Sequence, residues 1–251
     1  MTQELLSVVL QIAEEMTCCG AEISRIEESI TRMLCAYGAR RADVFATTSN
    51  MIVTVEDGEG APLTQTRRIR GIGTDMTKLD KLNALVREIC AKAPPVTEIK
   101  RSLSQIRAER QYPDWLVVLC YAMISASFCV FFGSRSLAET IAAFGIGLFV
   151  GILVKLFERV RFNRMLDRFA CSFFATSLAF LLVRLGALQS PDHTIIGIIM
   201  TLIPGVGLTN ALRDLFVGDL FTGMLRLLEA LLIAVSIGLG FIVTLILFGG
   251  V

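Results

Sequence analysis

The chain has 251 residues, 54% of them hydrophobic, and a mean hydropathy of +0.65. Its 24 basic and 23 acidic residues leave a net charge of +1, which gives no reason to expect nucleic-acid binding. The seven cysteines lack the spacing of a metal site, so we expect reduced thiols, no metal and no cofactor.

Charge and hydropathy divide the chain into two parts. The first 110 residues carry 30 of the 47 charged side chains, whereas five apolar stretches follow. Each stretch approaches the ~20 residues that an α-helix needs to cross ~30 Å of hydrocarbon. We therefore predict an α-helical membrane protein, in which a small cytoplasmic α+β domain, residues 1–112, precedes five transmembrane helices, residues 113–251. The stretches run from Trp115 to Gly133, Leu137 to Leu156, Phe169 to Leu188, Thr194 to Leu212 and Leu227 to Phe248.

The polar first part contains both helical and strand patterns. Apolar residues at helical spacing predict one helix before Gly20 and one after it, and a second pair of helices with one on each side of Pro94-Pro95. Between these pairs, β-branched residues predict three short strands. The strands are expected over Val44–Thr48, Met51–Val55 and Leu63–Arg70, with a turn at residues 57–60.

The distribution of basic residues predicts the orientation in the membrane. Five of them, from Lys155 to Arg168, lie at the end of the second apolar stretch and between it and the third, whereas the turn from Gln189 to His193 has none. Cytoplasmic loops retain positive charge, so we expect a cytoplasmic N-terminus and an outer C-terminus. We expect no signal peptide, because the apolar start contains Glu4 and lacks a basic leader.

The fourth apolar stretch is interrupted by Pro204, Gly205 and Gly207. In lipid an unpaired backbone group costs several kcal/mol, so such a break persists only beside protein or water. One interpretation is a kink that eases helix packing. The other is a half-helix whose N–H groups and positive dipole end bind a carboxylate, with neutral hydrogen bonds from Thr201, Thr209 and Asn210.

Charged residues follow this break. Asn210, Arg213 and Asp214 share one face of the predicted helix, and Arg226 and Glu229 share a face of the next. They form either a solvated boundary or a substrate gate. In the second case Arg213 or Arg226 would attract a substrate carboxylate. An acidic residue would then carry the coupling ion, and the candidates are Asp214, Asp219, Glu229 and Glu139.

Glu139 and Glu229 lie within a turn or two of an apolar span, where an ionised carboxylate costs ~2.5–3.5 kcal/mol at the centre. Either a proton carrier or an interfacial structural carboxylate fits this position. Arg184 could neutralise Glu139 or reach the outer interface. The single histidine, His193, is interpreted as a plain loop residue. Three glycines in the second span, Gly145, Gly147 and Gly151, are expected to permit close helix approach.

Two local patterns resemble the threonine/serine exporter (ThrE) family, in particular its short YjjP-like members. One comprises Gly20, Glu22, Arg25 and Glu27; the other runs from Pro204-Gly205 through Asn210, Asp214, Gly218-Asp219 and Gly223 to Arg226. The resemblance implies one subunit of a two-component exporter in a bacterial inner membrane. Its partner would be a small YjjB-like membrane subunit, and its substrates threonine and serine or succinate. The first pattern would then be a gate, a partner contact or a sensor.

Other function classes have less support in the sequence. The N-terminal part has no histidine, no Cys-x-x-Cys and no phosphate-binding loop, so any concentrative transport is expected to use a gradient. Two alternatives remain, a carboxylate-dependent hydrolase at Glu22 and Glu27, and a membrane-anchored, ligand-sensing domain. We expect a secondary exporter of small carboxylate-bearing metabolites that works by alternating access and is coupled to protons.

Overall fold

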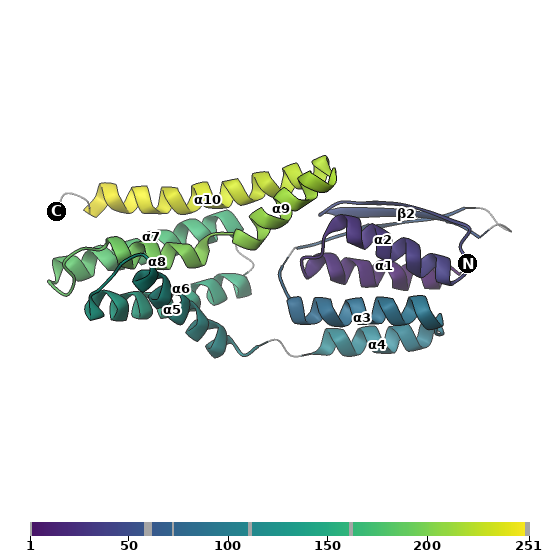
Figure 1. The fold of residues 1–251 in the computed structure, drawn as a ribbon, viewed down its shortest axis with the longest axis horizontal. Coiled ribbons are helices and arrows are strands. Elements are labelled where there is room, and N and C mark those ends of the chain that lie inside the picture. Colours follow the sequence, from purple (N-terminus) through teal and green to yellow (C-terminus); the bar gives the residue numbers. More distant parts are fainter. Residues whose placement is uncertain (1, 58–61, 72, 110–111, 161–162, 249–251) are drawn as a thin grey trace. The chain divides into compact units, whose positions relative to one another are not determined.

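The computed structural model describes residues 2–57, 62–71, 73–109, 112–160 and 163–248 (Figure 1). Most of the predicted turn at residues 57–60, and the C-terminal Val251, lie outside the described residues. The elements are α1 (Gln3–Cys18), α2 (Ile23–Ala36), β1 (Arg41–Ala46), β2 (Asn50–Glu56), β3 (Leu63–Arg68), α3 (Met76–Lys92), α4 (Val96–Ala108), α5 (Asp114–Phe131), α6 (Leu137–Val160), α7 (Arg164–Arg184), α8 (Asp192–Leu202), α9 (Gly205–Val217) and α10 (Leu220–Phe248).

The chain forms two compact units. The first comprises Met1–Arg110 together with Asn210–Met224, and the second comprises Gln111–Thr209 together with Leu225–Val251. The boundary therefore falls inside α9 and again inside α10. The last two turns of α9 and the start of α10 belong with the N-terminal part of the sequence.

The first unit consists of a three-stranded antiparallel sheet, in the order β1-β2-β3, and helices packed on it. Strand β2 turns Met51, Val53 and Val55 inward, where they are buried in one hydrophobic core with residues of α1 and α2. Helices α3 and α4 add a further layer beyond α1 and α2 (Figure 1). Pro95 is the residue before α4, with an extended ψ of 148°, and its missing N–H costs the helix no hydrogen bond there. The unit therefore has a core of its own.

The second unit is helical. Helices α5, α6, α7 and α10 are each long and apolar enough to cross a membrane. Helices α8 and α9 meet the same test together, but they are bent by 52° at a short break. The described chain thus has four candidate spans, or five if the bent pair is one span.

Glycines permit close packing between the helices of the second unit. A Cβ at Gly147 of α6 would lie 2.9 Å from Ala122 Cα of α5, and one at Gly151 would lie 3.0 Å from Val118 Cα. The predicted packing role is confirmed for these two glycines. It is wrong for Gly145, where a Cβ would have no neighbour within 4 Å.

Candidate functional site

The break in the fourth apolar stretch is a two-residue interruption between α8 and α9. Ile203 is extended, with ψ 130°, because a residue before proline is driven out of the α region. Pro204 has no N–H to continue the helix. The chain turns through a hydrogen bond from Gly205 N–H to the Ile203 carbonyl, 2.9 Å, and α9 then begins. The predicted helix break is confirmed.

The break lies at the surface of the chain. Gly205, Val206 and Gly207, which form the first turn of α9, are all exposed. Both neighbouring threonines bond to their own helices: Thr201 Oγ1 donates to the Ile198 carbonyl at 2.7 Å, and Thr209 Oγ1 to the Gly205 carbonyl at 3.0 Å. Their hydroxyl protons are therefore engaged, and their oxygens remain available as acceptors.

Within the first unit, α9 contacts the first family-like pattern, which is called the N-terminal motif below and comprises Gly20, Glu22, Arg25 and Glu27. The Arg213 guanidinium donates to the Glu22 carboxylate, although 191 positions separate the two residues. Glu22 immediately precedes α2, in the helix-capping position. Spacing of three residues along α2 would also allow Glu22 to pair with Arg25, but the carboxylate pairs with Arg213 instead. An ion pair thus joins Glu22 of the first pattern to a residue that lies within the range of the second, Pro204 to Arg226.

Gly20 explains why the N-terminal motif begins with glycine. Its φ is +92°, a conformation that other residues rarely adopt, and a Cβ would lie 3.0 Å from the Gly73 carbonyl oxygen. Gly73 in turn donates its N–H to the Cys18 carbonyl at 2.8 Å. Gly20 thus sets the tight corner that presents Glu22.

Glu27, one turn further along α2, accepts a hydrogen bond from Ala46 N–H at 2.8 Å. Burial raises the pKa of the Glu27 carboxyl above its ordinary value; the hydrogen bond from Ala46 opposes this shift, and the negative charge of Asp219 adds to it. Asp219 itself accepts the N–H of Thr222 at 3.2 Å and so caps the start of α10. Glu22 and Glu27 are both occupied by structural partners, which weakens the hydrolase alternative.

The raised pKa of Glu27 predicts a measurable pH dependence of stability. The folded state holds this proton more tightly than the unfolded chain, so the contribution of Glu27 to stability falls as the pH rises from 4.5 through the folded-state pKa. Glu27→Gln keeps an acceptor for Ala46 and removes the titration. We expect it to raise the free energy of unfolding at neutral pH by no more than about 1 kcal/mol, given solvent screening.

Thermal unfolding of Glu27→Gln just above pH 4.5 and at neutral pH would test this expectation. Glu28→Gln is the matched control, because Glu28 lies next along α2 in an exposed pair with Arg32. An equal change in both variants would contradict the role assigned to the Glu27 pKa.

Three further charged candidates lie in different environments. Asp214 is buried, at 3% exposure, and Arg226 is buried, at 9%. Glu229 by contrast pairs with Arg164 of α7 at 3.3 Å, and both side chains are more than 40% exposed. Of the two carboxylates, Glu229 matches the description of an interfacial structural carboxylate better.

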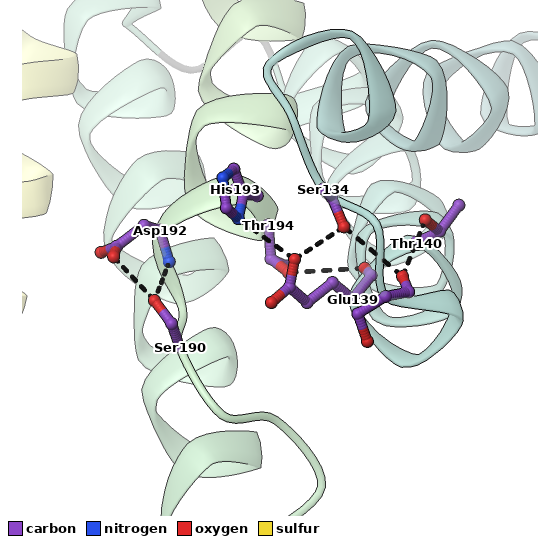
Figure 2. Close-up of polar contacts among 8 residues, drawn as sticks. Ser134, Glu139, Thr140, Ser190, Asp192, His193 and Thr194 are labelled. Atoms are coloured by element: carbon purple, nitrogen blue, oxygen red, sulfur yellow. Dashed lines mark hydrogen bonds and ion pairs between the residues drawn. The ribbon is translucent and has the colours of Figure 1, made fainter.

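Glu139 lies in the first turn of α6 and is buried (Figure 2). The interpretation of His193 as a plain loop residue is wrong, because His193 is the second residue of α8 and its Nδ1 lies 3.1 Å from Glu139 Oε2. The cation near Glu139 is also not Arg184, whose guanidinium stacks over the Phe248 ring at 5.4 Å. Pro191 followed by Asp192 is a helix-start signal, and it could have indicated that His193 lies in a helix rather than in a loop.

Spans that are broken at midpoint and that carry buried charge are typical of membrane transporters. The profile described as "Putative threonine/serine exporter" matches residues 7–248. The chain therefore belongs to the threonine/serine exporter (ThrE) family, and it is a multi-pass membrane protein. Membership in a transporter family indicates a transport protein rather than an enzyme.

Curated relatives carry two kinds of name. The "Probable succinate transporter subunit YjjP" of Klebsiella aerogenes is 28% identical over 92% of this chain and 88% of its own length; its Escherichia coli namesake is 26% identical over 92% and 89%. The "Probable threonine/serine exporter" of Mycobacterium tuberculosis is 24% identical over 97% of this chain but only 46% of its own length. No solved structure matches the chain significantly.

Proposed function

We propose that the chain is one subunit of a two-component secondary exporter in a bacterial inner membrane. It would move small carboxylate-bearing metabolites, threonine and serine or succinate, out of the cytoplasm by alternating access coupled to protons. Its N-terminus would be cytoplasmic and its C-terminus outside. The observation that carries the proposal is the exposed break at Pro204 in a chain of an exporter family.

The chemistry of the break suits a carboxylate. The first N–H groups of α9 have no partner within the helix, and the helix dipole places partial positive charge there. Gly205 and Gly207 carry no side chain, so a ligand could approach the backbone closely. Arg213 or Arg226 would attract the substrate from the cytoplasm. Among the proposed ion carriers, burial favours Asp214 and Glu139 over Asp219, which caps α10, and Glu229, which is paired at the surface.

The exposure of the break supports a partner subunit. Backbone that leaves helical geometry inside a bilayer must be covered by protein or must line a watery cavity. Two relatives named as threonine/serine exporters are about twice as long as the part that this chain matches. Relatives of similar length are named as transporter subunits. We infer that a small YjjB-like membrane subunit covers this side of the chain.

Efflux from preloaded cells tests the proposal. Cells would carry this chain, the small subunit, both or neither, and the release of labelled threonine, serine and succinate would be followed. We expect export of at least one substrate only when both are present. Export by this chain alone in liposomes would contradict the two-component arrangement, and no export by any combination would contradict the function.

The same assay addresses the charged residues near the membrane boundary. We expect Asp214→Asn and Arg226→Gln to lower export at matched membrane abundance, because each removes a buried charge. Arg159→Gln is a suitable control, since Arg159 is exposed and pairs with Asp114 at the surface. Unchanged efflux in both variants would remove the two residues from the mechanism.

The ion pair between Glu22 and Arg213 gives a further prediction. Exposed pairs contribute ~0.2–1 kcal/mol, so Glu22→Arg is expected to change export by no more than about fivefold. Adding Arg213→Glu restores the attraction and should recover much of the loss. Glu28→Arg, on an exposed part of α2, should have no effect. If the double variant exported less than Glu22→Arg alone and less than Arg213→Glu alone, the pair would not contribute to gating.

A further inference from the structure

One carboxylate oxygen joins three segments of the second unit. Glu139 Oε2, in the first turn of α6, accepts a hydrogen bond from Ser134 Oγ at 2.6 Å, and His193 Nδ1 at the start of α8 lies 3.1 Å from the same oxygen (Figure 2). Thr194 Oγ1 donates to the Glu139 main-chain carbonyl at 3.4 Å. The contact therefore ties α6 and the link before it to α8, the first half of the broken span.

The two side chains differ in their access to the surroundings. The exposed fraction is 10% for the Glu139 side chain and 37% for that of His193. The imidazole turns Nδ1 toward the carboxylate, and Nε2 lies beside the turn at Gly133, where a Cβ would be 3.8 Å away. His193 thus lies between the enclosed carboxylate and the exterior of the chain.

Other titratable and charged groups nearby do not take the place of His193. The Asp192 carboxylate turns away and accepts the Ser190 hydroxyl at 2.6 Å (Figure 2). The Cys129 thiol of α5 is close enough to interact electrostatically with Glu139 but is not a cation. Arg135, in the preceding turn, is exposed, and Arg184 lies over Phe248. In the described part of the chain, the basic partner of Glu139 is His193.

We propose that Glu139 and His193 are the outer proton-binding pair of the exporter, an inference that rests on the proposed function and orientation. A proton from outside binds His193 Nε2, and the Nδ1 proton passes to Glu139 Oε2, so that one N–H bond forms, one breaks and one O–H bond forms. With this proton the pair is neutral; without it the enclosed pair carries one negative charge, which burial disfavours. Imidazole is suited to this relay because one ring nitrogen can accept a proton while the other donates one.

The position of the pair suggests how proton binding is coupled to the break. Helix α8 begins at the pair and ends at Leu202, where the two-residue break of Ile203 and Pro204 begins. A change in the charge of the pair alters the attraction between α6 and α8. Because α8 is only 11 residues long, a shift at its start is transmitted along a rigid helix to the break.

Right-side-out membrane vesicles containing this chain and the small subunit provide the test. Vesicles preloaded with labelled threonine, serine or succinate would be assayed for efflux driven by external acidification, and separately for exchange against unlabelled substrate without a gradient. Net export requires proton movement, whereas exchange does not. For Glu139→Gln and His193→Asn we therefore expect acid-driven efflux to be lost and exchange to be retained.

Asp192→Asn is the matched control, since it removes a carboxylate at the same helix start that does not face Glu139; it should keep both activities. If Glu139→Gln does not accumulate in the membrane, His193→Asn, at the more exposed position, still tests the proposal. Acid-driven efflux that survives in the variants with its normal response to external pH would overturn the proposal. Equal loss of efflux and exchange would indicate a structural role and would also overturn it. A wild type that performs neither activity would instead defeat the proposed function.

Discussion

Straightening the break between α8 and α9 is expected to abolish export. Pro204→Ala with Gly205→Ala and Gly207→Ala would favour a continuous helix by about 5 kcal/mol, since proline costs ~3 and each glycine ~1 kcal/mol relative to alanine. The added methyl groups fit, because a Cβ at Gly205 meets nothing within 4 Å and one at Gly207 comes no closer than 3.9 Å to Pro204. The measurement is efflux of all three substrates at matched membrane abundance.

Gly145→Ala controls for the number of alanines in a membrane helix, because it adds a methyl to α6 in open space. It should export normally. A triple variant that exports as well as the wild type would show that the backbone at Pro204 takes no part in transport.

Adding a single methyl at Gly147 is expected to destabilise the packing of α5 on α6. The new Cβ would lie 2.7 Å from Ser125 Oγ and 2.9 Å from Ala122 Cα, so the two helices must separate. Overpacking of this kind costs about 1–3 kcal/mol. Gly147→Ala should therefore lower the midpoint of thermal unfolding in detergent, whereas Gly145→Ala, two residues earlier, should not. Equal midpoints would contradict the close approach of α5 and α6.

Local patterns in the sequence were sufficient to predict most helices and the break. A stretch of about 20 mostly apolar residues, or apolar residues at helical spacing, predicts a helix without knowledge of what the helix packs against. The interruption at Pro204 likewise depends on the geometry of proline itself. Strand β1 was predicted from Val44 but begins at Arg41, because the sheet edge accepts polar residues such as Arg41 and Asp43 on its outer side.

The side-chain pairs of the candidate sites could not be predicted in this way. Glu22 lies 191 positions from Arg213, and Glu139 lies 54 positions from His193. Spacing along a helix predicts local pairs, such as Glu22 with Arg25, but partners on other elements depend on how those elements pack. A family-like pattern singled out Glu22, and helix-face spacing singled out Arg213, but neither indicated that the two residues touch.

The length of α10 has a consequence for the membrane boundary. Its 29 residues extend about 43 Å, which exceeds ~30 Å of hydrocarbon. Such a positive mismatch is relieved by tilt or by overhang. Because Leu220–Met224 group with the N-terminal unit, we expect the surplus turns to project into the headgroup layer at that end. Glu229 would then lie at the headgroup interface. There it can remain hydrated beside Arg164, without the desolvation free energy of entering the acyl-chain region.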